Sequence, residues 1–330
     1  KGVLRRIPEV FDCWFESGSM PFGEAHYPFN KDEFNPKPGP FSKILGKTKG
    51  YPADFIAEGL DQTRGWFYSM LVLGVALFGK TPYRNVVVNG LVLAEDGQKM
   101  SKSKKNYPDL MLVVNKFGAD ALRYVLVSSP VVHAQDFLFS ERLVDEVVKK
   151  HIGRLNNVVS FYEMYATPEK GGKVDVKSKN PLDIWINNRL AELTSEITSG
   201  LEKYEIDRAA RPIADFIDDL STWYIRRSRD RFKAEGDKEV ELDKVMALTT
   251  TRNVLLDFAK LIAPFMPFLA EDVYLRLKGP LESVHLESWP ENTKVDGKVM
   301  DDMQNARKLT SLAMEARMKA KINVRQPLAK

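Results

Sequence analysis

The sequence predicts two kinds of architecture in one chain, an α/β domain followed by an all-α helix bundle. Near the N-terminal end, a continuous β-branched apolar run, 85–93, follows a helical apolar run, 64–78, as in an α/β fold. From about residue 140 onward, apolar residues recur at spacings of three and four, which is typical of packed helices. A chain of 330 residues is long enough for two or three domains.

The elements of the α/β part are predicted in the following order. The stretch 24–50 is rich in Pro, Gly, Lys and aromatic residues and predicts a long loop or insertion. Residues 64–78 predict a helix that ends at Gly79. The run 85–93 predicts a strand that is buried on both faces, as in a parallel sheet, and turn residues follow it at 95–98.

Three apolar stripes and one amphipathic segment predict the helix bundle. A turn-rich linker over 167–182 is expected ahead of it. Pro264 and Pro267 are expected to break or kink the third helix. The amphipathic segment is 303–321, which is basic on one side. The three stripes are Ile186, Leu190, Leu193, Ile197 and Leu201; Ile213, Phe216, Ile217, Leu220, Trp223 and Tyr224; and Val254, Leu255, Phe258, Leu261, Ile262 and Phe265.

Composition excludes several classes of protein. Lys and Arg number 49 against 45 Asp and Glu, so a nucleic acid would bind local clusters and not a globally basic surface. No apolar run is long enough for a transmembrane helix, and no membrane partner is expected. A single cysteine, Cys13, forms neither an internal disulfide nor a cysteine-based zinc site, so a cytoplasmic location is expected. The start at Lys1, without Met or signal peptide, predicts a piece of a longer polypeptide.

One loop carries the strongest chemical signal. The string Lys-Met-Ser-Lys-Ser follows the predicted strand and a Gly turn, and its two ammonium groups and two hydroxyls can clamp a polyphosphate. A generic loop of this composition is more often a solvated basic surface. The five residues are Lys99, Met100, Ser101, Lys102 and Ser103. The literal string resembles the second signature of class I aminoacyl-tRNA synthetases, with Asn106 and Pro108 following where that family often has them.

Further motifs extend this resemblance from residue 1 to residue 330. Residues 12–19 read Asp-Cys-Trp-Phe-Glu-Ser-Gly-Ser, and residues 58–67 read Glu-Gly-Leu-Asp-Gln-Thr-Arg-Gly-Trp-Phe. Together these two resemble the isoleucine enzymes of the class more than the valine and leucine enzymes. Four later segments resemble the anticodon-binding helices of the same enzymes, and they are 183–190, 223–232, 263–271 and 324–328.

The resemblance implies a fold and an activity. The implied fold is the second half of a Rossmann-like catalytic domain over 1–135, a connecting, tRNA-stem-contacting segment over 136–180 and a helical anticodon-binding domain over 181–330. The implied activity is activation of isoleucine by ATP with Mg²⁺ to isoleucyl-adenylate, then transfer to tRNA(Ile), by a monomer. The family's first signature, His-Ile-Gly-His, and its editing domain are absent from the chain. The chain alone is therefore expected to be inactive.

Residue roles follow from the same resemblance. Lys102 matches the residue that acts against the ATP phosphates, and Lys99 assists it. A carboxylate ahead of a helix can accept bonds from an ammonium or a ribose hydroxyl, and tryptophans can form rigid apolar walls. In isolation, capping and core packing are the commoner roles of such residues. The resemblance implies that the aminoacyl-adenylate and its isoleucine pocket involve Glu58, Gly59, Asp61, Gln62, Trp14 and Trp66.

A basic helix is the candidate tRNA contact, because arginines beside aromatic residues hold phosphates and stack bases. Its four arginines are Arg226, Arg227, Arg229 and Arg231. Their spacing spreads them around the helix, so they cannot all face RNA. Asp230 is expected to pair with one or two of them, since a solvated, salt-bridged face is the commoner role of a basic helix. A second basic cluster, equally ambiguous, comprises Arg307, Lys308, Arg317, Lys319 and Lys321.

Two short matches are rejected and three rivals stay open. Residues 74–81 match the P-loop pattern, but they end a helical run where a P-loop should open a helix. Residues 151–154, His-Ile-Gly-Arg, lack the last residue of the first signature and predict a helix surface. The rivals are a valyl- or leucyl-tRNA synthetase, a non-catalytic tRNA-binding module and, if Lys80 opened a helix after a strand, a P-loop switch. No zinc site is expected in this chain.

Overall fold

The contacts within the protein, a computed structural model, divide it into two compact units. The N-terminal unit comprises Lys1–Asn106 and Ser129–Phe139, and the helical unit comprises Tyr107–Ser128 and Ser140–Lys330. The residues that the structure describes are 2–3, 5–10, 12–30, 34, 50–101, 106–166 and 178–328. Most of the predicted loop 24–50, and the predicted linker up to residue 177, lie outside these ranges.

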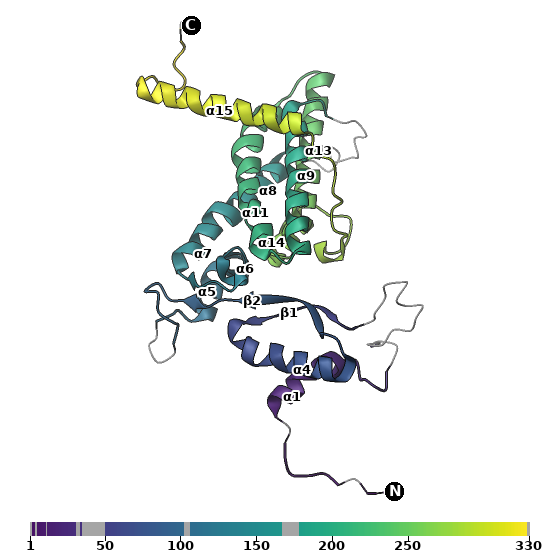
Figure 1. The fold of residues 1–330 in the computed structure, drawn as a ribbon. Helices are drawn as coiled ribbons and strands as arrows, with labels where there is room; N and C mark the ends of the chain where they lie inside the picture. Colours follow the sequence, from purple (N-terminus) through teal and green to yellow (C-terminus); the bar gives the residue numbers. More distant parts are fainter. Residues whose placement is uncertain are drawn as a thin grey trace. The chain divides into compact units, whose positions relative to one another are not determined.

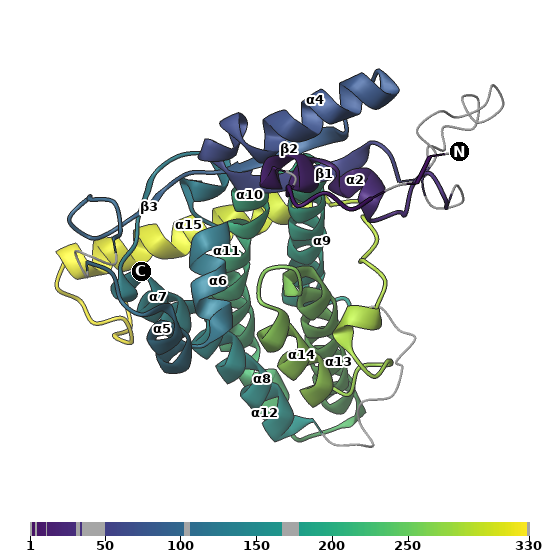
Figure 2. The same cartoon turned by 90° about the horizontal axis from the view of Figure 1, so that it is seen from below.

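A β–α–β motif forms the base of the N-terminal unit. Strand β1 (Ala53–Gly59) pairs in parallel with β2 (Tyr83–Asn89), and α4 (Trp66–Phe78) connects them along one face (Figures 1 and 2). A parallel pair requires such a crossover, because both strands must start at the same end. A second, shorter parallel pair joins β3 (Val92–Leu93) to β4 (Phe137–Leu138). The predicted α/β character is confirmed.

Two short helices precede this motif, α1 (Cys13–Gly18) and α2 (Met20–Gly23). The Asp12 carboxylate caps α1 by accepting a bond from the backbone N–H of Trp14 at 2.9 Å. Helix α1 packs against α4 at Gly18, where a Cβ atom would lie 3.0 Å from the side chains of α4. The Ser-Gly-Ser motif therefore has a packing role at its glycine.

The connecting helix begins later than predicted and ends as predicted. Arg64, the first residue of the expected helix, is the last residue of a 3₁₀ turn, Leu60–Arg64, and α4 begins at Trp66. Helix α4 ends ahead of Gly79, whose φ of +67° is left-handed. The strand prediction over 85–93 is correct in type but wrong in burial. Only Val87 of β2 is buried, because among the described strands β1 alone pairs with β2, and a short 3₁₀ turn, Pro130–His133, lies along it in place of a further strand. Gly90 interrupts the run before β3, where a Cβ atom would overlap the Gln135 backbone.

The helical unit is a bundle in which α9 and α13 run side by side while α15 crosses one end of them (Figure 1). No helix among the described residues is long and apolar enough to cross a membrane. The helices are α5 (Leu110–Phe117), α6 (Ala119–Val127), α7 (Glu141–Val147), α8 (Gly153–Tyr165), α9 (Pro181–Glu202), α10 (Ile206–Ala210), α11 (Pro212–Asp218), α12 (Arg226–Lys233), α13 (Lys238–Ile262), α14 (Pro267–Arg276) and α15 (Gly297–Lys319). Single π-helical turns, Val148–Ile152 and Asp219–Ile225, join α7 to α8 and α11 to α12.

All three predicted apolar stripes form the core of this bundle. Every member is buried except Leu201 and Trp223, which are half-buried. The two prolines separate α13 from α14, as predicted. Helix α6 fixes this break, because the Asp120 carboxylate accepts a 2.6 Å bond from the backbone N–H of Leu269, near the start of α14. Burial raises the pKa of Asp120 despite that bond.

The amphipathic segment predicted at 303–321 is α15, and it starts six residues earlier than predicted. Asp296 provides the cap, accepting bonds from the backbone N–H groups of Lys298 and Val299. No residue of α15 is buried, and α9 is the helix of the bundle against which it packs. This helix is therefore held by a few side-chain contacts near its N-terminal half.

A buried ionic network joins three helices of the bundle. The carboxylate of Asp183, on α9, is fully buried and accepts two 2.8 Å bonds from the Arg231 guanidinium and one 2.8 Å bond from the Tyr224 hydroxyl. Arg231, on α12, also pairs with Asp243 on α13 at 2.7 Å. Hydrogen bonds from Arg231 lower the pKa of Asp243, and burial raises that of Tyr224. The sequence did not predict this pairing, because its partners lie far apart along the chain.

We expect Asp183→Ala to lower the free energy of unfolding by about 3–5 kcal/mol, because the buried Arg231 charge loses its bidentate partner. Urea unfolding of the chain, followed by circular dichroism, measures this loss. Asp301→Ala is the matched control, since Asp301 is exposed on α15, and it should change stability by less than about 0.5 kcal/mol. Equal losses in the two variants would contradict a stabilising role for the network.

Candidate functional site

The carboxyl end of β1 leads directly into the residues predicted to bind the adenylate. Glu58 and Gly59 are the last two residues of β1, and the 3₁₀ turn after them carries Asp61 and Gln62 to the start of α4. The Glu58 and Asp61 carboxylates are both exposed. Ligands of parallel α/β sheets bind outside the carboxyl ends of the strands, so this is the expected edge for a site.

Gln62 organises the start of α4. Its side-chain oxygen accepts a 2.9 Å bond from the backbone N–H of Trp66, one of the donors that a helix start leaves unpaired. Its side-chain amide donates to the Asp61 carboxylate at 3.1 Å. Gln62 therefore has the helix-capping role that is common for a polar residue ahead of a helix. The bond from its amide also orients the Asp61 carboxylate.

The two predicted tryptophans lie on either side of Gly65. Trp66 donates a 2.9 Å bond from its indole N–H to the carbonyl oxygen of Ser17, which ties α4 to α1. The ring of Trp14 rests against Gly65, where a Cβ atom would lie 3.2 Å from it and 2.7 Å from the Gln62 oxygen. Trp14 is 46% exposed, and Trp66 is half-buried and packs against the core cluster of Ile56, Phe67 and Met70, so both keep some exposed surface. The structure brings these residues together from two motifs that lie about 50 positions apart.

Gly65 is a supporting residue that was not predicted from the sequence. The signal was present, because a glycine between Gln62 and Trp66 stands where a helix start usually favours a capping side chain. The packing shows why a side chain is excluded there, since a Cβ atom would crowd both the Gln62 side chain and the Trp14 ring.

The signature loop is anchored at its base by Asn106. Its side-chain oxygen accepts a 2.9 Å bond from the Ser101 N–H, and its amide donates to the Lys99 carbonyl at 3.2 Å. The backbone of Lys99 also forms an isolated antiparallel β-bridge with Leu93 of β3. Lys99 is exposed, and Met100 and Ser101 are half-buried. Lys102 and Ser103 lie outside the described residues, so their roles stay predictions.

The two rejected matches are confirmed as structural. Lys80 and Thr81 follow α4 and precede β2, which is the reverse of the order that a P-loop needs. His151 lies in the π-helical turn between α7 and α8, half-buried beside the ring of Tyr124. Desolvation lowers the pKa of His151, with Arg154 and Lys150 acting in the same direction.

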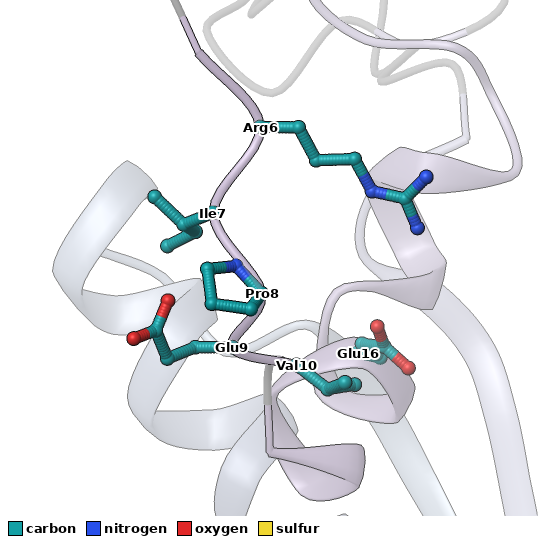
Figure 3. Close-up of a pocket in the computed structure, with 6 residues that line it drawn as sticks. All are labelled: Arg6, Ile7, Pro8, Glu9, Val10 and Glu16. Atoms are coloured by element: carbon teal, nitrogen blue, oxygen red, sulfur yellow. The ribbon is translucent and has the colours of Figure 1, made fainter.

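A shallow groove lies beside the extended N-terminal segment (Figure 3). Its lining residues are Arg6, Ile7, Pro8, Glu9, Val10 and Glu16. The Glu9 carboxylate points to one side of the segment, while Arg6 and Glu16 lie on the other (Figure 3). None of the predicted site residues lines this groove, and the described residues contain no group of three metal-ligating side chains.

The four arginines of the basic helix have different environments. Arg231 is 12% exposed and is occupied by Asp183 and Asp243. Arg227 stacks on Trp223, and Arg229 lies 5.8 Å from the ring of Phe161. The predicted pairing of Asp230 within the helix is wrong, because in the part of the chain that is described no arginine of this helix pairs with it. Arg231 takes its carboxylate partners from α9 and α13 instead.

Comparison with known families defines the class of protein. Residues 1–138 match the family of class I tRNA synthetases (I, L, M and V), and residues 183–330 match the anticodon-binding domain of tRNA ligases. The chain therefore carries part of a class I tRNA synthetase domain, followed by an anticodon-binding domain of tRNA ligases.

Within this class, the chain is similar to isoleucine–tRNA ligases. It is 43% identical over 337 residues to the ligase of Chlamydia trachomatis serovar A, and 42% identical over 334 residues to that of Chlamydia abortus. These matches cover 98% and 99% of this chain. The chain spans about 30% of the length of these relatives.

Solved structures share the fold. A LeuRS of Agrobacterium radiobacter K84, in a ternary complex with tRNA and LeuAMS, matches with a TM-score of 0.60 and 20% identity, over 89% of this chain and 34% of that one. The methionyl-tRNA synthetase of Mycobacterium tuberculosis, in complex with methionyl-adenylate, matches with a TM-score of 0.62 and 20% identity, over 79% and 48%. The predicted fold class, part of a class I catalytic domain followed by a helical anticodon-binding domain, is confirmed.

We expect Asn106→Ala to loosen the base of the signature loop. The Ser101 N–H loses its acceptor, and one such bond is worth about 1 kcal/mol, so its amide exchange should accelerate about fivefold. Hydrogen exchange followed by NMR or mass spectrometry measures this change. Asn305→Ala, an exposed substitution on α15, is the control. Unchanged exchange at residues 99–101 would show that the side chain does not hold the loop.

Proposed function

We propose that this chain is part of an isoleucine–tRNA ligase, which activates isoleucine with ATP and transfers it to tRNA(Ile). The observation that carries the proposal is the assembly of both isoleucine-type motifs, 12–19 and 58–67, at the carboxyl end of β1. Similarity to isoleucine–tRNA ligases along 98% of the chain supports it. A cytoplasmic monomer is the proposed form, and 1–135, 136–180 and 181–330 are its proposed domains.

The arrangement at the end of β1 suits recognition of an amino acid and its adenylate. We assign the apolar walls of the isoleucine pocket to Trp14 and Trp66, because both are anchored and both keep exposed surface. The Glu58 and Asp61 carboxylates are acceptors for the ammonium group or the ribose hydroxyls. Gln62 keeps Asp61 and Trp66 in place, and Gly65 leaves room for Trp14.

Activation in the full-length polypeptide requires positioning and charge neutralisation more than a protein nucleophile. The carboxylate of isoleucine attacks the α-phosphorus of ATP, an oxygen–phosphorus bond forms, and pyrophosphate leaves. Lys99 and Lys102 are assigned to the phosphates, where their charges stabilise the developing negative charge. Mg²⁺ entering with ATP would add charge neutralisation at the phosphates, beside Lys99 and Lys102. The Asn106 bonds hold Lys99 and Ser101 at the base of the loop.

The amino acid specificity is tested by ATP–pyrophosphate exchange on the full-length polypeptide with isoleucine, valine and leucine in parallel. We expect strong exchange with isoleucine, weak exchange with valine and none with leucine, because the motifs at 12–19 and 58–67 are of the isoleucine type. Strongest exchange with valine or leucine would instead favour a valyl- or leucyl-tRNA synthetase. Exchange with none of the three would favour the non-catalytic tRNA-binding module.

Two substitutions in the full-length polypeptide separate the assigned roles. Lys102→Ala should lower the exchange rate about 100-fold or more at unchanged isoleucine affinity, because its charge acts as negative charge develops. Trp66→Ala should instead weaken isoleucine binding about tenfold or more, through loss of apolar contact. Lys308→Ala on α15 is the control for Lys102. An unchanged exchange rate, or unaltered isoleucine affinity, would contradict the respective role.

A further inference from the structure

Two arginines that lie 80 positions apart in the sequence converge on one indole ring in the helical unit. The guanidinium carbon of Arg227, on α12, lies 3.3 Å from the ring centroid of Trp223, and that of Arg307, on α15, lies 5.3 Å from it. Arg307 also lies 5.8 Å from the ring of Trp185 on α9. We call Trp185, Trp223, Arg226, Arg227 and Arg307 the arginine–tryptophan cluster.

Tertiary contacts build this cluster. The indole N–H of Trp223 contacts the Met303 sulfur at 3.1 Å, which ties the π-helical turn to α15. Arg307 pairs with Asp219 at 2.6 Å, and Asp219 also pairs with Arg189 of α9 at 3.1 Å. The positions of Trp223 and Arg307 are therefore fixed by the bundle, whereas most long surface side chains are free to move.

The cluster carries more positive charge than its neighbours neutralise. Asp219 pairs with both Arg307 and Arg189, and Arg189 has further partners in Glu192 at 3.1 Å and Glu196 at 3.9 Å, so the three carboxylates are shared between these two arginines. Arg226 and Arg227 are exposed and pair with no carboxylate of the described chain. Desolvation lowers the pKa of Arg227, and the charges of Arg226 and Arg307 lower it further. Like charges held this close favour an anionic ligand.

The geometry selects the kind of anion. A guanidinium stacked on an indole presents its N–H donors outward in the plane of the stack, which suits phosphate oxygens. Stacked planar groups are also the surfaces on which nucleic acid bases rest. An acidic protein surface would use the charge but not the aromatic plane, so the combination favours a nucleotide.

We propose that the arginine–tryptophan cluster is a contact for one nucleotide of the bound tRNA, with Arg227 and Arg226 on phosphate and the Trp223 stack beside a base. This inference rests on the proposed function, which supplies tRNA as the partner. It differs from the sequence prediction of four arginines in one helix. Arg231 is excluded from the contact, because it pairs with Asp183 and Asp243 inside the bundle. The contact instead includes Trp223 and Arg307, and Arg307 comes from α15.

The test measures binding of a tRNA(Ile) transcript to the full-length polypeptide at several KCl concentrations. Arg227→Ala should weaken binding about fivefold to tenfold and reduce the salt slope by about one, because one phosphate contact and one stack are lost. Arg227→Lys should keep the slope and lose less affinity, since the charge remains but the planar stack does not. Arg208→Ala is the matched control, because Arg208 is exposed in the same unit and pairs with Glu205.

Two further readouts separate this role from a structural one and from the proposed function. Arg227→Ala should leave the melting temperature and the isoleucine-dependent pyrophosphate exchange unchanged. Unchanged tRNA affinity and slope would overturn the contact and leave the proposed function standing. Weaker binding with an unchanged slope and a lower melting temperature would also overturn it, as a folding effect. Failure of the unaltered polypeptide to bind tRNA(Ile) would overturn both proposals.

Discussion

The helical unit depends on the neutralisation of one buried carboxylate. Asp183 has no exposed surface, so its charge is tolerable only where Arg231 and Tyr224 reach it. Tyr224 belongs to the π-helical turn and Arg231 to α12. Arg231 also pairs with Asp243, which connects α13 to the same network. Adjacent side chains of a helical turn point in different directions, so Tyr224 turned inward leaves Trp223 facing α15. One internal ion pair thus fixes the rotation of the helix that presents the arginine–tryptophan cluster.

The N-terminal unit depends on a different constraint, the close approach of α1 to the start of α4. Two glycines, Gly18 and Gly65, make this approach possible, since a Cβ atom at either would crowd its neighbours. The bond from Trp66 to the Ser17 carbonyl then locks the two helices together. The consequence is a rigid base under the end of β1, which is the kind of support that positions a binding site to within a fraction of an ångström.

Local patterns predicted the elements, and contacts between distant residues decided the details. The three apolar stripes could be predicted because burial on a helix repeats at a regular spacing along the sequence. The residues around Gln62 could be predicted because they form one continuous motif. Burial of β2 depended on its neighbours, which its own sequence does not encode. Asp230 lies within reach of Arg226 and Arg227 along the helix, yet the strong pairing went to Arg231 and Asp183, which lie 48 positions apart. Asp296 was the missed cap that starts α15 early.

The path of the chain through its two units limits how such a protein can be recombined. The chain passes between the units after Asn106, after Ser128 and after Phe139, so neither unit is one continuous stretch of sequence. A single crossover between related genes therefore cannot exchange one unit intact. Asn106, which closes the signature loop, is the last residue before the first passage. A crossover that keeps the N-terminal unit intact must lie after Phe139. Such a crossover transfers α5 and α6 together with the signature loop, although these two helices pack in the other unit.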